Sequence, residues 1–209
     1  FFKNVENVQE DSLKEGNVRN LKSIVLQPRF LQAITAAAFA YAVMSFLMTA
    51  TPLSMHVMEN MSLKETGLVL QFHVVAMFLP SLITGNLIKK YGHSAIIYGG
   101  VLFFFITVLL SLFEQTYLNY MLSLIFLGLG WNFLFISGTS LVVLTYNKEE
   151  KFKVQGINDL IVFSTMALAS LSAGILLNSI GWKMMNIICI PFLILIILVS
   201  FVADKKSAS

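Results

Sequence analysis

The run IIYGGVLFFFITVLLSLF, at residues 96–113, decides the fold because it contains no charged side chain. A helix needs about 20 mostly apolar residues to cross the hydrocarbon of a bilayer. The stretch IICIPFLILIILVSF, at residues 187–201, has the same character. Both runs are too long and continuous for β-barrel strands, which alternate over about ten residues. They therefore predict an all-α integral membrane protein.

Further apolar segments lie on both sides of the first run, separated by short polar breaks. The chain is 57% hydrophobic and 12% charged, whereas soluble domains carry about 25% charged residues. We predict six transmembrane helices within residues 30–202. They cover about residues 30–52, 67–88, 94–113, 117–146, 157–180 and 184–202. Breaks this short require neighbouring helices to run antiparallel.

The basic residues indicate how the helices cross the membrane. If the spans alternate in direction, twelve Lys and Arg residues fall on one side and two on the other. The twelve are Lys3, Lys14, Arg19, Lys22, Arg29, Lys89, Lys90, Lys148, Lys151, Lys153, Lys205 and Lys206. Since loops rich in Lys and Arg stay in the cytoplasm, we expect both termini there. Residues 1–29 and 203–209 would then be cytoplasmic segments.

The polarity of the predicted spans follows a repeat. The third and sixth spans are the most uniformly apolar, whereas the other four carry more polar side chains within them. This pattern predicts two three-helix repeats, each with its third helix turned to lipid. Pro52, Pro80 and Pro191 should kink their helices. Ser170 and Gly174, four residues apart, predict close helix packing in the fifth.

The break after the second span reads GNLIKKYGH at residues 85–93. It resembles the signature loop of the major facilitator superfamily, which joins the second and third helices of each six-helix half in the cytoplasm. The matching positions are Gly85, Leu87, Lys89, Lys90, Gly92 and His93. Lys89 stands where the family often has Asp, and His93 stands for Arg, so the charge-relay role of that Asp is not carried over. A glycine at position 92 permits a sharp turn.

Other segments resemble a bacterial subgroup of the same family: residues 48–53, 71–73, 77–80, 130–133 and 155–159. The resemblance implies the C-terminal six-helix half of a twelve-helix permease, with residues 1–29 as the linker between halves. It further implies secondary transport of a small molecule by alternating access, with a proton or another ion as coupling partner. The implied partners are the lipid bilayer and a missing N-terminal half. The chain begins Phe1-Phe2-Lys3 and not with Met, which favours a fragment.

Five polar or aromatic residues within the spans are candidates for the substrate cavity: Thr49, Gln71, His73, Trp131 and Asn132. Polar groups at membrane depth are costly and usually face the interior of a bundle. His73 could contact substrate or carry a proton, or it could be a neutral side chain bonded between helices. Trp131 and Asn132 could form a binding surface, or they could pack tightly beside Gly128 and Gly130.

Asp159 is the acidic residue closest to a span interior, and Asn158 precedes it. Three interpretations remain open. Asp159 could be a proton-coupling carboxylate in the cavity, or an acid favoured by the helix dipole at a helix start. It could also pair with a basic residue of the other half and help close a cytoplasmic gate. We class Asp159 and Asn158 as candidates for gating or coupling.

Catalytic chemistry finds no support in the sequence. It contains no HExxH, GxSxG or Walker motif and no pair of cysteines, so we expect neither an enzyme nor a cofactor or metal site. The net charge is +3, and the basic residues lie between the apolar segments and form no stripe of the kind that binds nucleic acid. The alternative to a transporter half is a stand-alone six-helix subunit or scaffold without transport activity of its own.

Overall fold

The structure is a computed structural model that describes residues 19–208. These residues form helices and connecting turns without a strand, so the all-α prediction is confirmed. The α-helices are α2 Leu21–Val25, α3 Pro28–Pro52, α4 Leu63–Phe78, α5 Ser81–Tyr91, α6 His93–Ser111, α7 Tyr117–Val143, α8 Lys151–Ile188 and α9 Ile190–Ala208. Two short elements join them, a π-helix at Leu53–Met58 and a 3-10 turn at Lys148–Glu150. Residues 1–18 of the predicted linker lie outside the described residues.

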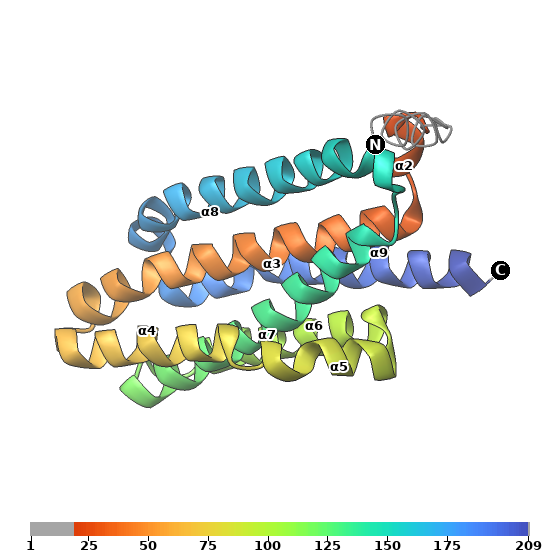
Figure 1. Cartoon of the computed structure of the whole chain (residues 1–209). Coiled ribbons are helices and arrows are strands. Elements are labelled where there is room, and N and C mark those ends of the chain that lie inside the picture. Colours follow the sequence, from red (N-terminus) through yellow and green to blue (C-terminus); the bar gives the residue numbers. More distant parts are fainter. Residues whose placement is uncertain (1–18, 209) are drawn as a thin grey trace, which may run out of the picture.

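Two helices, α3 and α7, form the centre of the bundle (Figure 1). α7 packs against α3, α4 and α6, while α8 and α9 pack against α3. Small residues allow these close crossings. A Cβ added at Gly138 would lie 2.7 Å from the carbonyl oxygen of Ala33, and Ala33 and Ala37 are fully buried. The alanine-rich face of α3 therefore meets the glycine of α7 backbone to backbone.

One proline and two glycines interrupt the helices, each because of its backbone properties. Pro80 lacks an N–H and separates α4 from α5, which are bent by 40°. The kink predicted at Pro80 is thus confirmed. Gly92 (φ 83°) is the one residue between α5 and α6, and Gly181 (φ 75°) interrupts the long helix α8. Glycine reaches such positive φ values without a steric penalty.

Several described helices are long and apolar enough to cross a membrane. Four stretches meet this criterion: Pro28–Met58, His93–Ser111, Tyr117–Val143 and Lys148–Ser207. The bent pair α4 and α5 makes five if it is counted as one span. The prediction of six spans goes beyond this count, and the last stretch contains the non-helical Gly181. α9 stays helical to Ala208, through most of the predicted tail.

One end of the bundle is held together by charged side chains. Arg29, at the start of α3, donates to Asp204 of α9 over 2.8 Å. The same carboxylate accepts hydrogen bonds from Ser94 and Tyr98 of α6. α2 and the C-terminal end lie at this end too, on the right of Figure 1. The segments that sequence analysis assigned to the basic side therefore share one end of the fold.

Candidate functional site

Asn132 binds the break between α4 and α5. Its amide nitrogen donates to the carbonyl oxygen of Met77 over 2.6 Å and to the hydroxyl of Ser81 over 2.7 Å. Its amide oxygen accepts from Thr84 over 2.6 Å. The side chain is fully buried. Asn132 therefore binds both sides of the break at Pro80, Met77 of α4 and Ser81 and Thr84 of α5.

His73 lies at the contact between α4 and α7. Its Nδ1 is 2.7 Å from the carbonyl oxygen of Leu124, and since a carbonyl only accepts, Nδ1 carries a proton. The other ring nitrogen is buried without a partner among the described residues. A Cβ at Gly128 would lie 2.7 Å from the backbone oxygen of His73. Glycine at that position lets the two helices come close enough for the histidine bond.

Trp131 packs within an aromatic cluster. Its ring stacks on Phe135 with centroids 4.9 Å apart, and Tyr41 of α3 meets it edge-on at 5.4 Å. Only 4% of Trp131 is exposed, and its indole nitrogen has no hydrogen-bond partner among the described residues. Sequence analysis singled out Trp131 but missed the rings around it. Phe135 lies on the same helix, whereas Tyr41 comes from α3 and could not be placed from the sequence.

The remaining cavity candidates lie on the surface of the described bundle. Gln71 of α4 is exposed, although His73 two residues later is buried. Thr49 of α3 is exposed too, and its hydroxyl lies 3.0 Å from that of Ser170 on α8. The five candidates thus divide into three buried residues around α7 and two exposed ones.

Asp159 is exposed on α8, more than two turns after the helix begins at Lys151, so it does not lie in the first turn that the helix-dipole interpretation assumed. Its carboxylate accepts a hydrogen bond of 3.0 Å from the amide nitrogen of Asn158. Asn158 is 3% exposed, and its own amide oxygen is buried without a partner among the described residues. The two gating candidates are therefore in contact, with one buried and the other open.

The residues of the signature loop end α5 and begin α6. Lys89 and Lys90 lie exposed in the last turn of α5, where positive charge is favoured by the helix dipole. His93 starts α6 directly after Gly92. A Cβ at Gly85 would meet no atom within 4 Å. No helix of the described chain therefore approaches Gly85 closely.

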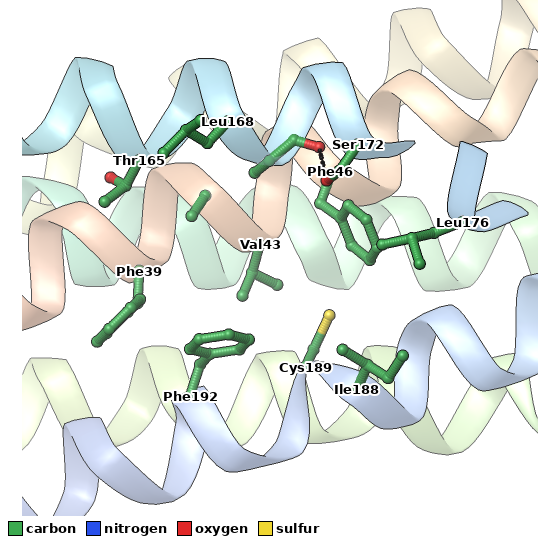
Figure 2. A pocket seen from close by; sticks show the side chains of 12 residues that line it. Phe39, Val43, Phe46, Thr165, Leu168, Ser172, Leu176, Ile188, Cys189 and Phe192 are labelled. Atoms are coloured by element: carbon green, nitrogen blue, oxygen red, sulfur yellow. Dashed lines mark hydrogen bonds between the residues drawn. The ribbon is translucent and has the colours of Figure 1, made fainter. Parts of the chain in front are cut away.

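An apolar cavity of about 560 Å³ lies between α3, α8 and α9, as Figure 2 shows. Sequence analysis predicted none of its residues as a site. Phe39 and Val43 of α3 face Phe192 of α9 across it, and Phe46 lies beside Leu176 of α8. Its two hydroxyl residues, Thr165 and Ser172, donate to backbone carbonyls of their own helix. This cavity thus lies apart from the polar candidates, and its chemistry suits an apolar occupant.

A second cluster that sequence analysis missed anchors the segment before α3. Arg19 donates to Glu150 through its backbone nitrogen and its guanidinium, with a shortest distance of 2.7 Å. It also donates to the carbonyl oxygen of Thr145. These hydrogen bonds from Arg19 lower the pKa of Glu150, which lies in the polar loop between α7 and α8, to about 2. Such a pairing across 131 positions has no signal in a single sequence.

A sequence model of a known protein family matches nearly the whole chain. The family is the Major Facilitator Superfamily, and the match covers residues 17–209. The chain belongs to the Major Facilitator Superfamily. The resemblance noted in the signature loop is thereby confirmed, and the chain is an integral membrane protein.

Three similar proteins carry the names of transporters. The riboflavin transporter RfnT of Brucella anthropi is 39% identical over 179 residues, which is 86% of this chain and 45% of the relative. The uncharacterized MFS-type transporter YdeG of Bacillus subtilis is 27% identical over 186 residues, 88% of this chain and 43% of the relative. The uncharacterized MFS-type transporter YddS of the same organism is 30% identical over 151 residues, which is 71% of this chain and 34% of the relative.

The chain spans less than half the length of these relatives. The family and the names of the relatives point to a transport protein and not to an enzyme.

Proposed function

We propose that the chain is the C-terminal six-helix half of a secondary active transporter that moves a small molecule by alternating access. In this proposal α4 and α5 form one span. The turn at Gly181 divides the last helical stretch, Lys148–Ser207, into two spans, so the five spans become six. Two three-helix repeats then follow in order, α3 to α6 and α7 to α9. The missing N-terminal half completes the protein.

The observation that carries this proposal is where the helices expose polar side chains. The polar residues within the apolar parts of α6 and α9, namely Thr107, Ser111 and Ser200, are all buried. Exposed polar residues are found instead on α3, α4, α5 and α8: Thr49, Gln71, Asn86 and Ser164. Because lipid solvates no polar group, we assign α6 and α9 to lipid. The other face would meet the second half and the transport path.

Glycines on the same face support this assignment. A Cβ at Gly67, Gly85, Gly156 or Gly174 would meet no atom within 4 Å. Glycine inside a helix costs about 1 kcal/mol relative to alanine. The close packing that we expected at Gly174 thus finds no partner in the described chain. Close approach by helices of the absent half would explain these glycines, which lie on α4, α5 and α8.

The proposed orientation places both termini in the cytoplasm, in the inner or plasma membrane. The ion pairs Arg29–Asp204 and Arg19–Glu150 gather the basic segments at one end, which supports this. Lys89 and Lys90 would lie there as well, close to lipid headgroups. Asp159 and Asn158 would act near this end as gating or coupling residues.

The substrate that we propose to test first is riboflavin, because the relative with 39% identity is named as its transporter. Gln71 and Thr49, which are exposed, would contact the substrate directly. His73, Trp131 and Asn132 lie beneath that face and would shape it. The coupling ion would be a proton or another cation, with Asp159 as the carboxylate that responds to it.

The test uses the full-length protein in sealed vesicles and measures uptake of radiolabelled riboflavin with and without a proton gradient. We expect uptake above empty vesicles and a loss of at least tenfold in Asp159→Asn if it couples transport. Phe201→Leu, on the lipid side of α9, is the matched control and should transport normally. A protein that reconstitutes in folded form yet carries none of a panel of radiolabelled small molecules would favour the stand-alone subunit or scaffold.

A further inference from the structure

Five aromatic rings from four different helices meet on the proposed transport face. They are Tyr41 of α3, Phe78 of α4, Trp131 and Phe135 of α7, and Phe163 of α8. Tyr41 contacts three of the other rings edge-on, with centroids 5.0 to 6.1 Å apart. Such edge-to-face and stacked contacts are each worth about 0.5–1.5 kcal/mol beyond the burial of area. The cluster is therefore an ordered set of rings.

The cluster is closed at its base and open at its rim. Trp131 is 4% exposed, whereas Phe78 is 59% and Phe163 is 51% exposed. The two exposed rings belong to α4 and α8, on either side of the central pair α3 and α7. The negative π-face of a ring attracts the positive edge of another ring, and an offset stack of two rings is also favourable. The rim therefore offers aromatic surface to something outside the described chain.

A row of hydroxyl groups starts at the same ring cluster. Tyr41, Ser45 and Thr49 recur every four residues on α3 and so share one face of the helix. At 1.5 Å per residue the row is about 12 Å long. At its far end the hydroxyl of Thr49 lies 3.0 Å from that of Ser170 on α8. Each hydroxyl can both donate and accept a hydrogen bond.

We infer that this face recognises a planar aromatic ring system carrying a hydroxylated chain. The rings of Tyr41, Phe78 and Phe163 bind the planar part, and the row from Ser45 to Thr49 binds the chain. Trp131 and Phe135 hold the rim rings in place from below. This inference rests on the proposed function, since it takes the exposed polar face of the described helices as the face that meets the substrate. An interface that merely packs against the absent half needs apolar bulk and no row of hydroxyls.

The experiment separates the two parts of such a ligand with three probes: riboflavin, lumichrome, which keeps the fused rings without the ribityl chain, and ribitol, which lacks the rings. Binding to the purified full-length protein is measured by calorimetry, and for the two flavins also by quenching of their fluorescence. We expect riboflavin to bind, lumichrome to bind more weakly, and ribitol not to bind detectably.

The variants assign each part of the ligand to its residues. Phe78→Leu and Phe163→Leu should each weaken the binding of both riboflavin and lumichrome by about tenfold. This loss corresponds to the interaction energy of one aromatic pair. Thr49→Val should weaken the binding of riboflavin and leave the binding of lumichrome unchanged. Phe152→Leu is the matched control, because Phe152 is 86% exposed on α8 outside the cluster, and it should bind both flavins normally.

Two results would overturn the inference. One is failure of both riboflavin and lumichrome to bind the folded protein, and the other is unchanged binding in the Phe78 and Phe163 variants. Uptake of a different radiolabelled substrate by the same preparation would then leave the proposed function standing. Absence of transport for every compound tested, with intact binding of riboflavin by the ring cluster, would reject transport and keep the site.

Discussion

At the scale of single residues, the buried polar side chains around α7 bind other helices of the chain. Asn132 places its amide against Met77, Ser81 and Thr84, so both its nitrogen and its oxygen form hydrogen bonds. Sequence reasoning recognised that a midspan asparagine must find partners. It could not say whether those partners are a substrate or a kinked neighbour, because that depends on which helix faces it.

Replacing Asn132 by alanine should destabilise the protein by about 1–3 kcal/mol, because a buried carbonyl and two hydroxyls lose their partner. The measurement is the thermal unfolding of the purified full-length protein in detergent. Gln71→Ala is the control, since Gln71 is exposed, and its midpoint should stay unchanged. If Asn132→Ala unfolds like the wild type but loses transport, Asn132 contacts the substrate and its structural role is minor.

At the scale of helices, glycines and a proline determine how the elements meet and bend. The kink at Pro80 could be predicted because proline removes a backbone donor wherever it occurs. The crossing of α6 and α7 could not, since it depends on Gly100 facing Leu134 across the interface. Gly99 and Gly100 are adjacent and identical in sequence terms, yet only Gly100 lies against the backbone of α7.

Gly100→Ala should destabilise the protein by about 1–3 kcal/mol, the usual cost of overpacking. Its Cβ would lie 2.7 Å from Leu134 and 3.0 Å from the backbone oxygen of Gly130. Gly99→Ala is the matched control, because its Cβ would meet only the ring of Phe133, at 3.4 Å. We expect that variant to be neutral or up to about 1 kcal/mol more stable. Equal unfolding midpoints for the two variants would contradict the helix packing.

At the scale of the whole molecule, ion pairs join segments far apart in the sequence at one end of the bundle. Arg19 and Glu150 connect the segment before α3 with the loop between α7 and α8. Ile24 of α2 is 1% exposed beside this contact. The docked segment should therefore be protected from proteolysis for as long as the ion pair persists.

Glu150→Gln should speed tryptic cleavage after Arg19 or Lys22 by at least several-fold, as followed by mass spectrometry. Glu149→Gln is the control, because Glu149 is an exposed neighbour, and it should be cleaved like the wild type. The pKa of Glu150 is lowered from 4.5 to about 2, so its contribution is complete above pH 4.5 and is lost toward pH 2. Protection of the wild type that varied between pH 6 and 8 would contradict this.

The orientation of the molecule can be tested with single cysteines. Lys64→Cys should react with a membrane-impermeant maleimide on intact cells, whereas Lys151→Cys should react only after permeabilisation. The reason is that loops rich in Lys and Arg remain in the cytoplasm. Cys189 is 2% exposed, which makes it a poor competitor for the reagent. The reverse labelling pattern would invert the proposed topology.

The sequence by itself determined that this chain is helical and lies in a membrane, because apolar run length and the low content of charge depend on composition alone. It also indicated the family, through a local loop motif that agreed with the number and orientation of the predicted spans, and the kink at Pro80, through a missing backbone donor. Only the tertiary structure decided which polar residues are buried and which face outward. It also brought the five rings together and paired Arg19 with Glu150, because contacts between distant segments arise from the packing of whole helices.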